Sequence, residues 1–256
     1  MWRAIGASAR GTSHIVSDLP CQDAWAQRTA FVGGEFVTIL AIADGAGSAK
    51  ASDLGSQECV AHLVHAISTS DFRISEMDQD VASTWLESGR KHLEALAVEK
   101  ELSPRDLACT ALVAVLGESE SIFFQVGDGA WIAEYQGHCE PITWPLSGEY
   151  ANETTFLSSP NWKSQMQFRR WASSTMSIAG FTDGLQGLAL HFASKAVHAP
   201  FFAPMFGALH RTDNVNTLQA PLLQFLNAPV LNERTDDDKT LVLACREKLK
   251  LRHGAD

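Results

Sequence analysis

Residues 37–48 read VTILAIADGAGS, an apolar run that ends abruptly at Asp44 and is followed by a turn of small residues. The run is rich in β-branched residues and too short to span a membrane, so it predicts a buried strand. An aspartate at the end of a buried strand is costly unless a positive charge meets it. Because the turn contains no Lys or Arg before Lys50, we expect a metal ion to be that partner.

Four further aspartates lie beside predicted strands. Asp183 ends a strand and precedes a glycine, as Asp44 does, and Asp237 comes directly before the last apolar strand. Asp128 lies between two strands and Asp23 borders another. Antiparallel strands bring the end of one strand beside the start of the next, so we expect these five carboxylates to meet at one edge of the sheets.

Such a cluster of carboxylates repels itself strongly and therefore requires cations. A site made of oxygen ligands favours Mn²⁺ or Mg²⁺ over zinc. Two such ions, about 3.5–4 Å apart, can clamp a phosphate and activate a water molecule. Gly45 and Gly184 are consistent with this arrangement, because small residues let backbone carbonyls or waters approach the ions.

The order of the predicted elements indicates an α+β fold with two sheets and outer helices. Strands are expected over residues 2–9, 24–32, 36–43, 109–116, 121–126, 130–135, 174–181 and 240–245, and long helices from about 52 and over about 77–100. The Asp128-Gly129 pair predicts a tight hairpin. We expect one domain over 1–256, with an irregular flap-like insertion at about 141–172 and a charged tail over 246–256.

Composition limits the classes of function and compartment. The chain has 256 residues, 45% of them hydrophobic, which is enough for a sizeable core. Its net charge of −10 argues against nucleic acid as a partner, because binding to phosphate backbones needs a basic surface. The five cysteines are scattered without a Cys-x-x-Cys pair, and no stretch reaches the roughly 20 apolar residues of a membrane span. With no signal-peptide pattern at the N-terminus, we expect a cytoplasmic protein without membrane contact.

Six short motifs occur in an order that resembles the metal-dependent protein phosphatases of the protein phosphatase 2C type. They are CQD at 21–23, AIADGAG at 41–47, ACTA at 108–111, VGDG at 126–129, FTDGL at 181–185 and DDKTLV at 237–242. Each motif alone is weak, but together they span about Gly11 to Cys245. The Ser-His and Cys-Gln-Asp layout near the N-terminus is similar to a bacterial branch of the family.

The resemblance implies a four-layer α-β-β-α sandwich with two central antiparallel sheets. It also implies a phosphoprotein phosphatase that hydrolyses phosphoserine and phosphothreonine and opposes a serine/threonine kinase. The reaction would be attack by water that two Mn²⁺ or Mg²⁺ ions activate, without a phosphoenzyme.

The same resemblance assigns roles to individual residues. Asp44 would bridge the two ions and the carbonyl of Gly45 would hold one of them. Asp183 and Asp237 would complete the shell of the second ion, so that Asp44, Asp183 and Asp237 form the catalytic set. Asp23 would act through water. Asp128 would bind a further, weaker ion together with Asp183.

The chain departs from the family pattern at several places. Ala46 replaces a histidine that is a candidate general acid in the family, and Gln22 replaces a glutamate. Residues 17–20 occupy the place of an arginine that holds the phosphate, which leaves Arg10 or His14 as candidates for that role.

Two other interpretations follow from these features. The departures leave open a catalytically weak or silent module that binds phosphoproteins as a regulator. A dinucleotide-binding loop at 45–50 is disfavoured, because its sixth position is Lys50 and the fingerprint requires Gly or Ala there. Asp236 and Asp238, which flank the Asp237 motif position, are expected to be solvated or to tune the local electrostatic field.

Overall fold

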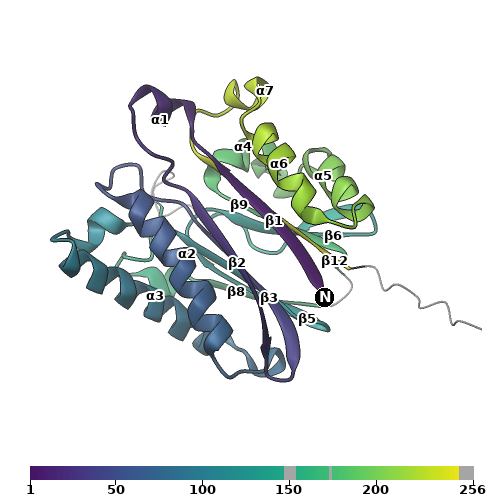
Figure 1. Cartoon of the computed structure of the whole chain (residues 1–256), viewed down its shortest axis with the longest axis horizontal. Coiled ribbons are helices and arrows are strands. Elements are labelled where there is room, and N and C mark those ends of the chain that lie inside the picture. The colour runs from purple at the N-terminus through teal and green to yellow at the C-terminus, as the bar shows by residue number, and fades with distance from the viewer. Residues whose placement is uncertain (147–153, 173–174, 248–256) are drawn as a thin grey trace, which may run out of the picture.

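Two antiparallel sheets pack face to face, and helices cover both outer faces (Figure 1). The computed structural model describes residues 1–146, 154–172 and 175–247. This arrangement is the predicted α+β sandwich of four layers, with two five-stranded sheets in the centre.

Each of the two central sheets contains five strands, and strands that follow one another in the order given are hydrogen-bonded neighbours. The first sheet contains β1 (Trp2–Ala9), β12 (Lys239–Arg246), β9 (Ser177–Phe181), β6 (Ala130–Tyr135) and β7 (His138–Pro141). The second contains β2 (Ala24–Val32), β3 (Glu35–Ala43), β4 (Ala111–Leu116), β5 (Glu120–Val126) and β8 (Gln167–Ala172). Two short strands, β10 (Leu190–His191) and β11 (Ala196–Val197), form a separate ribbon.

The helices divide between the two outer faces. The α-helices are α1 (Thr12–Val16), α2 (Ser52–Thr69), α3 (Gln79–Glu99), α4 (Gln186–Ala189), α5 (Ala199–Arg211), α6 (Gln219–Leu226) and α7 (Pro229–Asn232). The 3-10 turns are η1 (Ile74–Glu76), η2 (Pro104–Leu107), η3 (Trp162–Gln165), η4 (Asp183–Leu185), η5 (Phe192–Ser194) and η6 (Val215–Leu218). Helices α2 and α3 lie on the second sheet, and α5 and α6 lie on the first (Figure 1).

Three separate hydrophobic clusters fill the three interfaces between the four layers. An aromatic pair marks each interface: Trp85 with Phe124, Phe202 with Phe181, and Phe123 with Trp131. Neighbouring side chains of a strand point to opposite faces, so Phe123 packs between the sheets while Phe124 packs under the helices. Both faces of β5 are therefore buried, which explains the apolar run Ile122-Phe123-Phe124 at its centre.

The prediction of a hairpin at Asp128-Gly129 is wrong. Strand β5 pairs with β4 and β8 in the second sheet, whereas β6 pairs with β7 and β9 in the first. In the type I′ turn that Asp-Gly favours, both central residues have positive φ. Here the positive φ, +117°, belongs to Gly127, and the chain crosses from one sheet to the other. The crossing carries Asp128 to the rim where the two sheets meet.

The segment over 141–172 differs from the expected irregular insertion. Its last residues form η3 and then β8, which pairs with β5 along its length. The middle of the segment, 147–153, lies outside the described residues, as does most of the expected charged tail. The prediction of irregular structure up to 172 is therefore wrong for β8, which forms the edge of the second sheet.

Candidate metal centre

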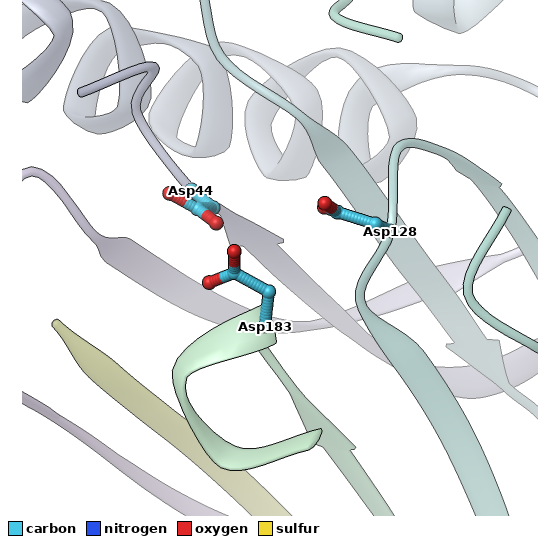
Figure 2. Close-up of side chains that lie close together, drawn as sticks. All are labelled: Asp44, Asp128 and Asp183. Atoms are coloured by element: carbon cyan, nitrogen blue, oxygen red, sulfur yellow. The ribbon is translucent and has the colours of Figure 1, made fainter. Parts of the chain in front are cut away.

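Three aspartates from distant parts of the chain converge at one rim of the sandwich (Figure 2). Asp44 directly follows β3, Asp128 lies between β5 and β6, and Asp183 begins η4 after β9. One carboxylate oxygen of each lies within 4.8 Å of the others. Because β3 and β9 belong to different sheets, both sheets contribute to the cluster.

The backbone of Asp44 is fixed on the start of β4. Its N–H donates to Thr110 Oγ1 at 2.9 Å, and its carbonyl accepts from the Thr110 N–H at 2.8 Å. Gly45 follows in a tight space, where an added Cβ would lie 2.7 Å from the Gln22 carbonyl oxygen and 2.8 Å from Ser52. The sequence Asp-Gly therefore lets the chain turn closely while the Asp44 carboxylate points into the cluster.

Asp128 is held from two sides. Its Oδ2 accepts from Thr154 Oγ1 at 2.6 Å, and its backbone carbonyl accepts from Gln186 Nε2 at 2.6 Å. Its other carboxylate oxygen, Oδ1, is buried without a hydrogen-bond partner among the described residues. This orphaned oxygen is a ligand atom that a cation would satisfy.

Asp183 is positioned by the close approach of two segments. An added Cβ on Gly184 would lie 2.0 Å from the Asp238 carbonyl oxygen, so only glycine allows η4 to rest on the start of β12. The neighbouring Thr182 accepts from the Thr240 N–H at 3.0 Å and donates its Oγ1 proton to Asp23 Oδ2 at 2.7 Å. Thr182 thus connects the Asp183 turn to the early acidic motif.

Asp23 and Asp237 lie near the cluster of three but outside it. Asp23 is 5% exposed, and its Oδ1 atom has no hydrogen-bond partner among the described residues. Asp237 is exposed, and its charge is close enough to raise the pKa of both Asp128 and Asp183. The five predicted carboxylates therefore occupy one rim, with Asp44, Asp128 and Asp183 at its centre.

The electrostatics of the rim are unfavourable for bare carboxylates. Burial, followed by the charges of Asp23, Asp183 and Asp128, raises the pKa of Asp44 well above its usual range. Burial also raises the pKa of Asp23 and Asp128, and burial with Asp128 and Asp237 raises that of Asp183 to about 6. Each of these carboxyls would be easier to ionise beside a cation.

The residues of the rim are chemically suited to bind a divalent metal ion. Across the described residues, none of the five carboxylates forms an ion pair with a Lys, Arg or His. The side-chain atoms of the cluster of three that could bind a metal are all carboxylate oxygens. Asp23 and Asp128 each have one buried oxygen without a hydrogen-bond partner among the described residues. Oxygen-only sets of this kind suit Mg²⁺ or Mn²⁺.

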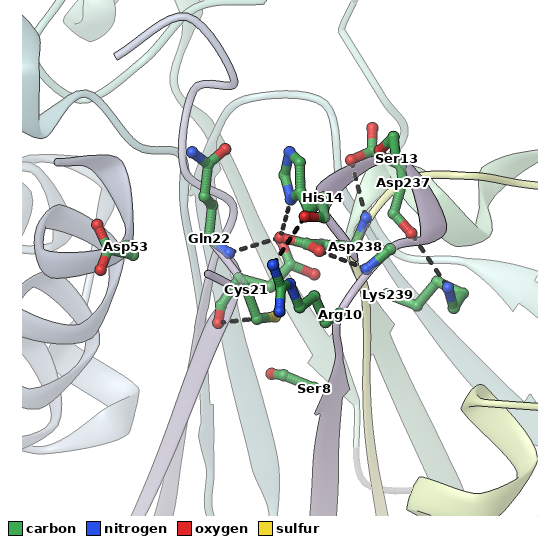
Figure 3. Close-up of polar contacts among 12 residues, drawn as sticks. Ser8, Arg10, Ser13, His14, Cys21, Gln22, Asp53, Asp237, Asp238 and Lys239 are labelled. Atoms are coloured by element: carbon green, nitrogen blue, oxygen red, sulfur yellow. Dashed lines mark hydrogen bonds and ion pairs between the residues drawn. The ribbon is translucent and has the colours of Figure 1, made fainter. Parts of the chain in front are cut away.

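A second polar group lies beside the rim and centres on Asp238 (Figure 3). The prediction that Asp238 is solvated is wrong, since the residue is 3% exposed. Its carboxylate accepts from the Gly11 N–H at 2.6 Å and from the Gln22 N–H at 2.5 Å, and it lies 2.9 Å from His14 Nδ1. Two backbone donors and an imidazole compensate for the burial of its charge. Asp236, by contrast, is exposed as expected.

The two candidates for holding a phosphate both lie in this second group. His14, in α1, has a side chain that is 12% exposed and pairs with Asp238. Arg10 donates its Nη2 to the His14 carbonyl at 2.8 Å and lies 3.5 Å from the exposed Asp18 carboxylate. Arg10 therefore fixes the backbone of the segment that carries His14.

Sequence reasoning missed Asp238 and Thr182 as parts of this region. Asp238 stands in a run of three aspartates, which is typical of a solvated turn, and nothing local distinguishes the buried one. Thr182 precedes the Asp183-Gly184 pair, and its partners, Asp23 and Thr240, are distant in the sequence. The pairing of β9 with β12 brings Thr182 beside Thr240, and the packing of the two sheets brings Asp23 to Thr182.

Comparison with known proteins adds a family to this geometry. The protein phosphatase 2C family profile matches residues 10–227. The chain is also 36% identical over 251 residues to serine/threonine-protein phosphatase 3 of Escherichia coli K12, an alignment that covers 95% of this chain and 98% of the relative.

Solved structures share the fold at lower identity. Serine/threonine phosphatase Stp1 from Staphylococcus aureus is 15% identical with a TM-score of 0.68, covering 97% of this chain and 96% of that one. The serine/threonine phosphatase of S. agalactiae is 18% identical with a TM-score of 0.69, covering 96% and 100%. These likenesses agree with the sandwich of two antiparallel sheets. Within the described part of the chain, no helix is long and apolar enough to cross a membrane.

Proposed function

The chain belongs to the protein phosphatase 2C family, and on that premise we propose how its own residues carry out the metal-dependent hydrolysis of phosphoserine and phosphothreonine in proteins. The enzyme is a serine/threonine phosphatase whose substrates are phosphorylated proteins. We further propose that these phosphoproteins are the products of a serine/threonine kinase, which the enzyme opposes in the cytoplasm.

We propose that two Mn²⁺ or Mg²⁺ ions bind at the rim. Asp44 would bridge them with support from the Gly45 carbonyl, and Asp183 and Asp237 would complete the ligand shell of the second ion. Asp23, buried with one unsatisfied oxygen, would hold a water of the first ion. Asp128 would bind a further, weaker ion together with Asp183, whose carboxylate lies in the same cluster.

When bound, the cations would supply an activated water as nucleophile and neutralise charge on the phosphate. The residues of the chain position the reacting groups. Thr110 fixes Asp44, Thr154 fixes Asp128, and Thr182 fixes Asp23, each by a direct hydrogen bond. We propose that Arg10 and His14 face the phosphate, with Arg10 also bracing the His14 backbone.

The observation that carries this proposal is the convergence of Asp44, Asp128 and Asp183 within 4.8 Å, without an ion pair to any described cation of the chain. A regulatory module without catalysis would gain nothing from holding three repelling carboxylates together, and no observation favours that alternative.

The test measures hydrolysis of p-nitrophenyl phosphate and of a phosphoserine peptide by the full chain in Mn²⁺, Mg²⁺ or EDTA. We expect turnover with either metal, none in EDTA, and none for Asp44→Asn with either metal. Asp213→Asn, at an exposed aspartate away from the rim, is the matched control and should keep wild-type rates. Near-full activity of Asp44→Asn, or wild-type turnover in EDTA, would remove the site assignment.

A further inference from the structure

Hydrolysis of a phosphoserine must expel the serine oxygen, which is a poor leaving group. The P–O bond breaks toward an alkoxide, which is strongly basic, so a proton donor accelerates this step by about 10²–10⁴-fold. In this chain the position after Asp44-Gly45 is Ala46, which is 6% exposed and carries no proton to give. Another group must supply that proton if the enzyme is to release serine efficiently.

His14 has the features of a held proton donor. Its Nδ1 lies 2.9 Å from Asp238 Oδ2, so a buried carboxylate stands directly beside the ring. Asp238 itself is anchored by the backbone N–H groups of Gly11 and Gln22 and cannot swing away. With the carboxylate on the Nδ1 side of the ring, the other ring nitrogen, Nε2, is available for proton transfer.

The location of this pair connects it to the metal centre. Gln22 donates its N–H to Asp238 and accepts from the Gly45 N–H at 3.1 Å, so one residue bridges the two groups. The charge of Asp238 also acts on the Asp23 carboxyl, which shows that the two are close. In Figure 3 the second ring nitrogen of His14 points away from Asp238.

The other proton carriers near Asp238 are already committed. Lys239 is 0% exposed and donates Nζ to the Asp237 carbonyl at 3.1 Å, which keeps it from a bound substrate. The Cys21 thiol points to the Asp23 carbonyl, at 3.7 Å. Arg10 is also paired with a carboxylate, that of Asp18, but a guanidinium does not give up a proton. Among the described residues of this second group, His14 is therefore the partly accessible one that can act as an acid.

We propose that His14, oriented by Asp238, is the general acid that protonates the leaving serine oxygen. The water oxygen forms the new P–O bond while the bond from phosphorus to the serine oxygen breaks and leaves its electron pair on that oxygen. The proton on His14 Nε2 moves to the serine oxygen, and the proton lost by the attacking water passes to solvent, from which His14 is protonated again. This inference rests on the proposed function, because it assumes hydrolysis at the rim.

The experiment compares esters that differ only in their need for a proton. His14→Gln retains an N–H donor that can hold a phosphate but cannot act as an acid, and His14→Ala removes both abilities. With Mn²⁺ saturating, we expect His14→Gln to lower kcat for a phosphoserine peptide by about 10²-fold or more. The same variant should lower kcat for p-nitrophenyl phosphate by less than about threefold, because nitrophenolate leaves without protonation. Phenyl phosphate should fall between them.

Each outcome has one meaning. An equal loss of kcat for all three esters, or a change in KM alone, would overturn the inference and leave His14 as a phosphate-holding residue. Asp238→Asn tests the positioning role: its losses should follow the same order of leaving groups, and a uniform loss would reduce Asp238 to a structural role. His138→Gln, an exposed histidine on β7, is the control. Failure of the proposed function would look different, since the wild type itself would not hydrolyse any ester.

Discussion

Replacing Asp183 with Asn should stabilise the metal-free protein while removing its response to metal. The pKa of Asp183 is raised from 3.8 to about 6 by burial and by the charges of Asp128 and Asp237. At 1.36 kcal/mol per pKa unit, this shift corresponds to at most about 3 kcal/mol lost from the free energy of unfolding at neutral pH. Asn carries no charge, but its buried amide still needs hydrogen bonds at the same position. We therefore expect Asp183→Asn to raise the free energy of unfolding by about 1–3 kcal/mol in EDTA.

The pH dependence gives this prediction a definite sign. The folded state binds the Asp183 proton more tightly than the unfolded state, so the cost is fully present above about pH 6 and disappears below the unfolded pKa. The stability gap between Asp183→Asn and wild type should therefore close as the pH falls from 7 to below about 4. For a chain of this length the gap at pH 7 corresponds to roughly 3–8 °C in Tm.

Thermal unfolding in EDTA and in Mn²⁺ measures both effects. Mn²⁺ at 100 times its Kd should stabilise the wild type by about 2.7 kcal/mol, and most of this gain should be absent in Asp183→Asn. Asp213→Asn should match wild type in both buffers because it is exposed and away from the rim. A variant that is less stable than wild type in EDTA, or that keeps the full Mn²⁺ response, would refute the account of Asp183 as a repelling metal ligand.

Two further substitutions probe the geometry of the rim. Gly184→Ala should lower the free energy of unfolding by about 1–3 kcal/mol and reduce kcat, because its Cβ would lie 2.0 Å from the Asp238 carbonyl oxygen and push η4 away from the start of β12. Chemical denaturation and turnover measurements check this prediction. Gly187→Ala is the control, since nothing lies within 4 Å of the added Cβ, and it should leave both quantities unchanged. Asp128→Asn should slow turnover without abolishing it, because this carboxylate is proposed to hold only the weaker ion; kinetics equal to wild type over a Mn²⁺ titration would assign Asp128 to the crossing between sheets alone.

Hairpins show how far local sequence predicts this fold. Gly33-Gly34 lies between two predicted strands, a composition typical of a turn, and both glycines have positive φ, which closes β2 onto β3 with Val32 opposite Glu35. Gln136 and Gly137 also both have positive φ, and they close β6 onto β7. Gln is an unusual residue at the first position of such a turn, so the sequence does not predict it. Asp128-Gly129 has the favoured composition but forms a crossing, because its two flanking strands find better partners in separate sheets.

The sequence predicts which aspartates lie at the site, but not which of them lie closest together. Their placement beside strands shows in the sequence because apolar runs end or begin at them, as at Asp44 and Asp183. Which of them approach most closely depends on how the two sheets are stacked. The sequence and the family resemblance rank Asp237 above Asp128, whereas the structure places Asp128 in the cluster of three and leaves Asp237 exposed.

The origin of the three central carboxylates links metal binding to the packing of the sandwich. Asp44 extends from the second sheet, Asp183 from the first, and Asp128 from the crossing between them. Without a cation their mutual repulsion opposes the contact of the two sheets at this rim, while Phe123 and Trp131 favour it in the interior. Cations bound among the three carboxylates would reverse the sign of the first effect and connect the sheets. By linkage, substitutions that loosen the interface between the sheets should weaken metal affinity even when they are far from the carboxylates.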